Sequence, residues 1–222
     1  TLCYIEDLLP DGSCRMCMVE IENRGRTKME TACTAQVGEG LVVTTNSEKV
    51  RNARRNILDM LLSNHKTDCF SCPSNGDCKL QELCFEYGIE RTTYSGEQTE
   101  LPIDDSNKFF TYNPNLCILC HRCVNTCHKI VGRGAIDTME RGFDSVIGTP
   151  FNIPWKETIC ESCGNCVQAC PTGALTMKRR KNYRKYQIDK KVLTTCPHCA
   201  TGCQYYLLVK DNRIVDVEGA NG

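Results

Sequence analysis

The run Cys117-Ile-Leu-Cys120-His-Arg-Cys123-Val-Asn-Thr-Cys127 recurs further along the chain as Cys160-Glu-Ser-Cys163-Gly-Asn-Cys166-Val-Gln-Ala-Cys170-Pro171. Both runs have the spacing C-x2-C-x2-C-x3-C, in which three closely spaced thiolates converge on one face of a [4Fe–4S] cluster. A valine follows the third cysteine in each run, so we interpret the pair as an internal duplication. Two matched runs of this kind predict two iron–sulfur clusters.

The fourth cysteine of each run is expected to belong to the opposite cluster, because these ligands cross over in two-cluster ferredoxins. The exchange would fasten the two halves of the duplication together. The predicted ligands of the first ferredoxin site are Cys117, Cys120, Cys123 and Cys170. The predicted ligands of the second ferredoxin site are Cys127, Cys160, Cys163 and Cys166. We assign both sites to a ferredoxin domain over residues 114–178.

The composition points to several small domains. The chain has 222 residues, of which 19 are cysteine and only 7% are aromatic, so there is little material for one large apolar core. Small domains with thin cores need disulfides or bound metal for stability. The odd number of cysteines and the C-x2-C pairs favour metal clusters over disulfides. Thiols that stay reduced indicate a cytoplasmic location. We therefore predict an α+β chain made of small cluster-binding modules.

The charge and the chain ends carry less information. The formal net charge is zero, so overall charge indicates neither a nucleic-acid partner nor a membrane partner. The sequence has no apolar run of membrane-spanning length and no signal-peptide pattern. It begins at Thr1 without an initiator methionine and stops at Gly222 without a closing element. We therefore interpret it as an internal fragment of a longer polypeptide.

Residues 1–46 predict a [2Fe–2S] domain, a partial β-grasp that lacks its N-terminus. The predicted ligands are Cys3, Cys14, Cys17 and Cys33. One early cysteine, a close pair and one distant cysteine suit a cluster at the rim of a small sheet. We expect strands over 16–21, 28–32 and 41–45, with a turn at 23–26. A tetrahedral zinc site is the alternative for these four cysteines.

Residues 47–90 predict a small helical domain. The stretch Thr45–Glu48 has the form of a capping box, and apolar residues follow it at helical spacing. The predicted ligands of a further [4Fe–4S] cluster are His65, Cys69, Cys72 and Cys78. A neutral imidazole in place of a thiolate should raise the potential, as it does in Rieske centres. Cys84 is interpreted as a buried free thiol on a helix over 79–87, and an all-cysteine zinc site that includes it is the alternative.

Two polar stretches separate the predicted modules. Residues 91–113 are turn-rich and predict a linker or wrapping loop. Residues 179–192 predict a basic interdomain linker that contains most of the run Lys178–Lys185. The loop after Cys127 is four residues longer than its counterpart and lacks the proline found after Cys170. We expect this loop to have been remodelled for a contact with a neighbouring domain.

Residues 193–222 carry another cysteine motif. Cys196, Cys199 and Cys203 are spaced C-x2-C-x3-C. They predict a [4Fe–4S] cluster whose fourth ligand lies beyond the end of the sequence. His198 lies between two of these cysteines and is badly placed to complete a zinc knuckle. Strands over 204–209 and 213–217 should form a hairpin, and we expect the motif to open a further, larger domain.

The predicted function is electron transport. The assignments above use every cysteine except Cys84 and require one [2Fe–2S] and four [4Fe–4S] clusters. The sequence offers no Ser/His/Asp triad, no Gly-rich phosphate loop and no acid pair. We therefore predict no catalytic residue in these 222 residues. Cluster potentials would be graded by charge, hydrogen bonds and solvent exposure.

The motifs also resemble known families, in order along the chain. Cys3 to Cys78 resembles the N-terminal region shared by the large iron–sulfur subunit of complex I, iron-only hydrogenases with accessory clusters and NAD-linked formate dehydrogenases. Cys117 to Pro171 is similar to the two-cluster insert of the latter two groups. Cys196 to Cys203 resembles the opening of the molybdopterin oxidoreductase domain. The combination is most similar to the catalytic (alpha) subunit of an NAD(P)- or ferredoxin-linked molybdenum/tungsten formate dehydrogenase.

That resemblance implies a route and its partners. Electrons from formate would leave a molybdenum or tungsten bis-molybdopterin guanine dinucleotide in a domain outside this sequence. They would pass the Cys196 cluster, both ferredoxin sites, the His65 cluster and the [2Fe–2S] cluster. The expected partners are flavin- and NAD(P)-binding iron–sulfur subunits of the diaphorase type, or ferredoxin. The alternatives are the relay of an iron-only hydrogenase or other complex I-like oxidoreductase, and a non-catalytic zinc-bound interaction module.

Overall fold

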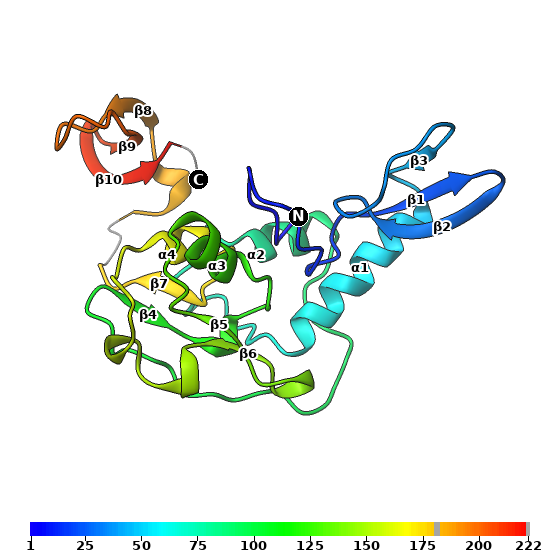
Figure 1. Cartoon of the computed structure of the whole chain (residues 1–222), viewed down its shortest axis with the longest axis horizontal. Coiled ribbons are helices and arrows are strands. Elements are labelled where there is room, and N and C mark those ends of the chain that lie inside the picture. The colour runs from blue at the N-terminus through cyan, green and yellow to red at the C-terminus, as the bar shows by residue number, and fades with distance from the viewer. Residues whose placement is uncertain (180–182, 221–222) are drawn as a thin grey trace. The chain divides into compact units, whose positions relative to one another are not determined.

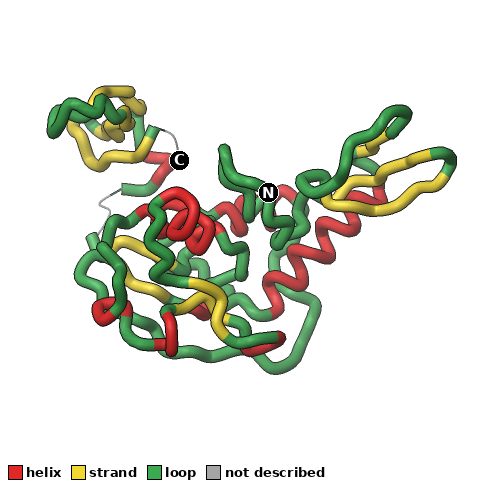
Figure 2. The backbone as a smooth tube through the Cα atoms, in the orientation of Figure 1, coloured by secondary structure: helices red, strands yellow, loops and turns green. Residues whose placement is uncertain are grey.

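The computed structural model describes residues 1–179 and 183–220 of the chain. The chain divides into two compact units, Thr1–Met177 and Lys178–Gly222, and each is described by itself. The first unit combines short helices and strands with long connecting loops (Figure 1, Figure 2). Part of the predicted basic run, residues 180–182, lies outside the described residues. Over the described ranges, no helix has the length and apolar character needed to cross a membrane.

The first unit begins with a small antiparallel sheet. Its strands are β1 (Met18–Asn23), β2 (Arg26–Thr31) and β3 (Val42–Thr44), in the order β2-β1-β3. Val19 and Ile21 alternate along β1 and are buried, as expected for a strand with one covered face. The three strands lie where the sequence predicts them, with ends shifted by up to two residues.

The long helix α1 (Glu48–Ser63) follows this sheet, and its start corrects the predicted capping box. The N-cap is Ser47, whose hydroxyl accepts a hydrogen bond from the Val50 amide at 3.1 Å. The Ser47 hydroxyl also donates to the Glu20 carboxylate on β1. A serine directly before the first helical turn satisfies a free amide, whereas Thr45 lies too far from the helix to do so.

Side chains of α1 connect the sheet to the next helix. The Arg54 guanidinium donates to the Met18 carbonyl at 2.8 Å and to the Tyr87 hydroxyl at 3.2 Å. The helix α2 (Lys79–Glu86) ends beside Tyr87, and its residues Leu80, Leu83 and Cys84 are buried on one face. The predicted helix over 79–87 and the buried position of Cys84 are confirmed.

One apolar core joins segments that are far apart in the sequence. It combines the N-terminal loop, both helices and the first cysteine run: Leu2, Cys3, Cys14, Met16, Leu58, Leu62, Leu80, Leu83, Cys84, Ile118 and Cys120. Cysteines from two predicted sites therefore lie in the same core. The N-terminal modules and the ferredoxin-like region form one packed body.

The ferredoxin-like region closes through its two ends. Strand β4 (Phe110–Tyr112) pairs antiparallel with β7 (Leu175–Met177). β4 lies wholly inside residues 91–113, which the sequence predicts as a linker, and its residues Phe110 and Tyr112 are buried. A second strand pair, β5 (Asp137–Met139) with β6 (Val146–Gly148), occupies the segment between the two cysteine runs.

Two short helices repeat the duplication in three dimensions. Helix α3 (Arg122–Asn125) contains Cys123 and continues into a π-helical turn, η2 (Thr126–Ile130). Helix α4 (Asn165–Ala169) contains Cys166. Short 3-10 helices complete the connections: η1 (Pro114–Leu116), η3 (Gly142–Asp144), η4 (Pro150–Asn152) and η5 (Trp155–Glu157).

The second unit is a three-stranded antiparallel sheet. Its strands are β8 (Lys190–Thr195), β9 (Gln204–Lys210) and β10 (Arg213–Gly219), in the order β10-β9-β8, after the 3-10 helix η6 (Lys185–Gln187). The predicted hairpin is confirmed, and both Asp211 and Asn212 have positive φ, as a two-residue hairpin turn requires. β8 was not predicted from the sequence and overlaps the range expected to be a basic linker.

Candidate metal centres

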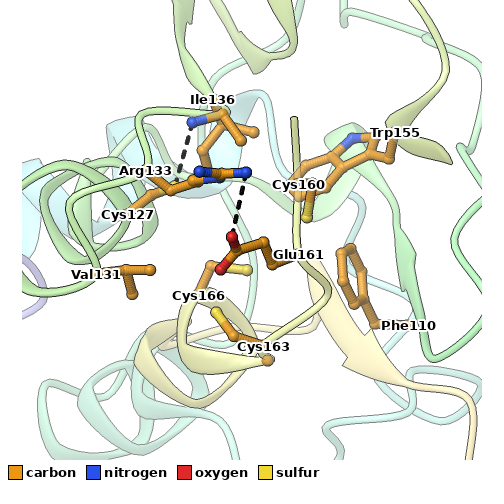
Figure 3. Close-up of a pocket in the computed structure, with 12 residues that line it drawn as sticks. Phe110, Cys127, Val131, Arg133, Ile136, Trp155, Cys160, Glu161, Cys163 and Cys166 are labelled. Carbon is orange, nitrogen blue, oxygen red and sulfur yellow. Dashed lines mark hydrogen bonds and ion pairs between the residues drawn. The ribbon is translucent and has the colours of Figure 1, made fainter. Parts of the chain in front are cut away.

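The four cysteines predicted for the second ferredoxin site line one cavity. Cys160, Cys163 and Cys166 come from the second run, and Cys127 comes from the first. Figure 3 shows these thiols facing a common space, with Phe110 and Trp155 on one side. Ile136 and Val131 complete the apolar wall. The cavity is therefore lined by sulfur and hydrocarbon, with a charged pair at its edge.

The residues of the first ferredoxin site line a separate cavity. Cys117, Cys120 and Cys123 of the first run line it together with Cys170 of the second run. Its wall also includes Tyr112, Ile118, Ile147, Pro171 and Leu175. Each cavity thus receives three cysteines from one run and one from the other, which is the grouping that crossed ligation requires.

The backbone explains why the runs present their sulfurs alike. Leu119 and Ser162 occupy equivalent places and both have positive φ, as do His121 and Gly164. These left-handed residues turn the chain back toward the cavity. The Leu119 amide then donates to Cys117 Sγ, and the Ser162 amide donates to Cys160 Sγ, each at 3.4 Å.

Aromatic rings fill the space between the two cavities. The ring centroids of Phe110 and Trp155 are 5.1 Å apart at an interplanar angle of 83°, and those of Tyr112 and Trp155 are 5.7 Å apart. Phe110 and Trp155 line the second site, whereas Tyr112 lines the first. Edge-to-face rings of this kind add to the packing and keep water away from both sites.

Burial strongly disfavours free thiolates at these positions. Burial, the largest cause, and neighbouring thiols together raise the pKa of Cys117, Cys120 and Cys166 to about 12 each. The thiols contribute because several negative charges would share one cavity. Ligation by thiolates at these sites therefore requires a compensating cation, and metal binding would release the protons. The donor set fits an iron–sulfur cluster.

The arrangement of the sulfurs bears on the zinc alternative. Among the residues that the structure describes, no group of three or more His, Cys, Asp or Glu side chains converges on one ion position. A zinc ion requires all its cysteine sulfurs at about 2.3 Å from a single atom. The thiols here line the walls of cavities instead, and a cluster's cysteines bind different iron atoms.

The predicted [2Fe–2S] ligands lie close together at the start of the chain. Cys17 Sγ and Cys33 Sγ are 3.3 Å apart, and the Leu2 amide donates to Cys14 Sγ at 3.4 Å. Burial, together with the nearby thiols of Cys17, Cys3 and Cys14, raises the pKa of Cys33 to about 11.

The His65 site has a buried histidine with an unpartnered nitrogen. His65 follows the C-cap of α1 and is only 7% exposed. Its Nδ1 is buried and has no hydrogen-bond partner, and burial lowers the pKa of the imidazole. A neutral, unpartnered imidazole nitrogen suits a metal ligand, because buried polar atoms normally have partners.

The three cysteines predicted to accompany His65 are close enough to affect one another. Burial raises the pKa of Cys78, with further increases from Cys72 and Cys69. The pKa of Cys84 is also raised, to about 11, by burial and by the nearby thiols of Cys78 and Cys69. Cys84 nevertheless belongs to the apolar core beneath α2.

In the second unit, the last cysteine motif forms the loop between β8 and β9. The Cys196 amide donates to the Cys203 carbonyl at 2.8 Å, which closes the loop. Hydrogen bonds with Thr201 lower the pKa of Cys199. Cys199 and Cys203 are exposed. The three cysteines are therefore gathered in one accessible loop.

The first ferredoxin site contacts the [2Fe–2S] loop directly, which sequence reasoning did not foresee. Ser13, beside Cys14, donates to the Cys120 carbonyl at 3.1 Å. Arg122 donates to the Tyr4 carbonyl at 2.8 Å, and His121 Nδ1 lies 2.8 Å from the Asp11 carboxylate. Only the position of Arg122 between two cysteines signals these contacts in the sequence.

The same site also contacts the His65 module. The Lys79 amide donates to the Pro171 carbonyl at 2.9 Å. Gly173 lies against Cys72 so closely that a Cβ at this position would be 2.7 Å from Cys72 Sγ. The first ferredoxin site therefore lies between the two N-terminal modules.

Sequence comparisons match family models along most of the chain. Residues 1–48 match a 2Fe-2S iron-sulfur cluster binding domain, and residues 54–93 match the NADH-ubiquinone oxidoreductase-G iron-sulfur binding region. Residues 108–176 match the ferredoxin-like domain of NADH-quinone oxidoreductase subunit 3, and residues 159–206 match a 4Fe-4S dicluster domain. Both cluster types are therefore represented.

Three curated relatives have different names. NADPH-Fe(3+) oxidoreductase subunit alpha of Geobacter sulfurreducens is 39% identical over 96% of this chain and 25% of its own length. An NADH-quinone oxidoreductase subunit of Rhizobium meliloti is 39% identical over 92% of this chain and 24% of its own length. A Staphylococcus aureus protein named as a formate dehydrogenase is 30% identical over 98% of this chain and 26% of its own length. The chain spans about a quarter of these relatives.

A solved structure and a further relative have hydrogenase names. The chain resembles a chain of the NAD+-reducing [NiFe]-hydrogenase with a TM-score of 0.74 and 30% identity, over 81% of this chain and 75% of that one. A subunit of the NADP-reducing hydrogenase of Solidesulfovibrio fructosivorans is 38% identical over 79% of this chain and 30% of its own length. Proteins that are named for several different activities are thus similar to this chain.

Proposed function

This chain belongs to the family of NADH-quinone oxidoreductase iron–sulfur regions, and from that premise we propose that it is an electron relay. The observation that supports this proposal most strongly is the pair of cavities. Each cavity is lined by three cysteines of one run and by one cysteine of the other. Bound iron–sulfur clusters supply one-electron chemistry. The chain's own residues hold them, exclude water and donate hydrogen bonds to the sulfurs.

We propose the following ligand sets. Cys3, Cys14, Cys17 and Cys33 hold a [2Fe–2S] cluster, and His65, Cys69, Cys72 and Cys78 hold a [4Fe–4S] cluster. The first ferredoxin site uses Cys117, Cys120, Cys123 and Cys170, and the second uses Cys127, Cys160, Cys163 and Cys166. Cys196, Cys199 and Cys203 contribute three ligands to a further cluster.

The contacts support an order of sites that differs from the linear route expected from the sequence. The first ferredoxin site touches the [2Fe–2S] loop through Ser13 and the His65 module through Gly173. We therefore place it at the junction between those two sites. The second ferredoxin site is its neighbour on the other side, across the Trp155 ring.

The complete protein is proposed to be a formate dehydrogenase, with a molybdenum or tungsten pterin centre beyond these residues. Two points support this: the C-x2-C-x3-C motif of the second unit, and a formate dehydrogenase relative matched over 98% of the chain. Flavin- and NAD(P)-binding partner subunits fit the names of the NADPH- and NADH-linked relatives. We propose a cytoplasmic location, because cysteines that serve as cluster ligands must stay reduced and thiols stay reduced in that compartment.

A hydrogenase relay is the second candidate. The structural resemblance to a hydrogenase chain and the hydrogenase relative favour it. That relative matches 79% of the chain, however, whereas the formate dehydrogenase relative matches 98%. The hydrogenase relative has the higher identity, 38% against 30%, so the formate assignment rests on the C-x2-C-x3-C motif of the second unit.

Anaerobic purification of the full chain with iron and sulfide analysis tests the relay itself. We expect a brown protein with visible charge-transfer absorption and EPR signals of reduced clusters. A colourless protein that contains zinc would refute the proposal. In the complete protein with its pterin domain, reduction of the clusters by formate, followed as bleaching of the visible absorption, supports the formate assignment. Bleaching by hydrogen but not by formate would select the hydrogenase candidate.

A further inference from the structure

The longer loop after Cys127 folds back onto the second ferredoxin site. Its residue Arg133 donates from Nε to the Ile159 carbonyl at 3.0 Å. Arg133 Nη2 also lies 3.1 Å from Glu161 Oε1. Ile159 immediately precedes the second cysteine run, and Glu161 lies inside it. Within the first unit, this loop therefore contacts the second cysteine run of the duplication. The contact with a neighbouring domain that the sequence predicts stays a prediction.

Arg133 and Glu161 both line the cavity of the second ferredoxin site, beside Cys127 and Cys160 (Figure 3). The same loop ends at Ala135, whose amide donates to Cys127 Sγ at 3.3 Å. The loop thus supplies the site with a fixed positive charge and with a hydrogen bond to a ligand sulfur. Both features influence the reduction potential of iron–sulfur clusters.

The first ferredoxin site has a different pair, because His121 lines its cavity and His121 Nδ1 lies 2.8 Å from the Asp11 carboxylate. Of the described residues that line this cavity, none is Arg, Lys, Asp or Glu. The duplication has therefore kept the cysteine geometry and placed an Arg–Glu pair in the lining of the second site only.

We propose that Arg133 is a tuning residue that raises the reduction potential of the cluster held by Cys127, Cys160, Cys163 and Cys166. This inference rests on the relay function proposed above. Reduction adds one electron to a site that already carries thiolate charge, so a nearby cation favours the reduced form. Glu161 acts in the opposite direction, and Arg133 offsets its charge.

Because the Arg133–Glu161 pair is exposed, its effect on the reduction potential should depend on salt concentration. A purely structural role of Arg133 predicts no such dependence. The Arg133 side chain is 46% exposed and that of Glu161 is 58% exposed. Charges at the surface are screened by dissolved ions, with a Debye length of about 10 Å at 0.1 M salt and about 3 Å at 1 M. The contribution of Arg133 should therefore shrink as salt concentration rises.

The test is an EPR-monitored redox titration of the cluster-loaded full chain, with dithionite as the one-electron donor. The signal of the second ferredoxin site is identified as the one lost in Cys163→Ser. We expect Arg133→Gln to lower the equilibrium constant for its reduction about threefold to tenfold, which is about 30 to 60 mV. Glu161→Gln should raise the constant, and the double variant should lie between the two single ones.

Two controls separate charge from loop structure. Arg133→Lys keeps the charge but not the forked hydrogen bonds, so it should retain most of the potential. Arg51→Gln removes the same charge from α1, which contributes no residue to either cavity, and should leave the potential unchanged.

An unchanged potential in Arg133→Gln at low salt, with clusters present, would overturn the inference. If Arg133→Gln loses the cluster, Glu161→Gln decides the matter, because an unchanged potential there refutes charge tuning. Absence of clusters from the unmodified protein would instead refute the relay function.

Discussion

The two ferredoxin sites have the same cysteine geometry but different surroundings. The first site is enclosed by neighbouring modules, with Ser13 on one side and Gly173 against Cys72 on the other. The second site reaches the surface, where Cys163 is exposed and the Arg133–Glu161 pair forms its edge. A duplicated motif can thus preserve how metal is held while its loops diverge in what they contact.

This difference assigns the two sites different tasks in the proposed relay. The first is a junction whose position depends on packing between modules. The second is an outlying site whose charge environment is set by one loop. Changes at the first should therefore affect stability, whereas changes at the second should affect redox and optical properties.

The largest expected effect concerns Trp155, the only tryptophan in the chain. It is 3% exposed and lines the second ferredoxin site. A coloured cluster in that cavity would accept the excitation energy of the indole. Loading with iron and sulfide should therefore quench most of the tryptophan fluorescence. Because the first site lies across the Tyr112 and Trp155 rings and its cluster would still quench, Cys163→Ser, which is expected to remove the second cluster, should restore only part of the emission. Cys199→Ser in the second unit should restore none.

Gly173→Ala should have the next largest effect, because the added Cβ would lie 2.7 Å from Cys72 Sγ. Overpacking of this kind costs about 1–3 kcal/mol. We expect the free energy of unfolding, measured by denaturant titration, to fall by that amount. Gly38→Ala is the matched control, since a Cβ there meets nothing within 4 Å. Equal stability of the two variants would show that the first site is not closely packed against the His65 module.

Ser13→Ala should have the smallest effect of the three. It removes the hydrogen bond from the Ser13 hydroxyl to the Cys120 carbonyl, which is part-buried. The loss of one such bond costs about 0.5–1.5 kcal/mol. Denaturant titration should detect it when compared with Ser71→Ala, which removes only an exposed local bond to Asp68. A destabilisation no greater than that of Ser71→Ala would argue against a fixed contact between the [2Fe–2S] loop and the first site.

The spacing of the two cysteine runs predicts two ferredoxin sites, and cysteines of both runs line each of two cavities in the structure. The ligand sets stay a prediction. The ferredoxin grouping follows from the duplication, and the hairpin of β9 and β10 follows from Asp211-Asn212 and its apolar flanks. These features depend on residues close in sequence, or on a repeated pattern. For residues of these types at these spacings, few other local structures are possible.

Other features depend on contacts that no local pattern encodes. Strand β8 is rich in lysine and threonine and forms because β9 offers it a partner along six residue pairs. The Ser47 cap was missed in favour of Thr45, although both have hydroxyl side chains, because only the backbone decides where α1 starts. The Arg133–Glu161 pair joins two runs whose approach is fixed by the tertiary fold.

The central claim is that the two cysteine runs exchange their fourth ligands. Its most direct test is EPR spectroscopy of the full chain carrying Cys170→Ser, beside Cys120→Ser and Cys163→Ser as references for the two sites. Crossed ligation predicts that Cys170→Ser perturbs the same signal as Cys120→Ser and spares the one lost in Cys163→Ser. A Cys170→Ser spectrum that matches Cys163→Ser, with the Cys120 signal intact, would contradict the account.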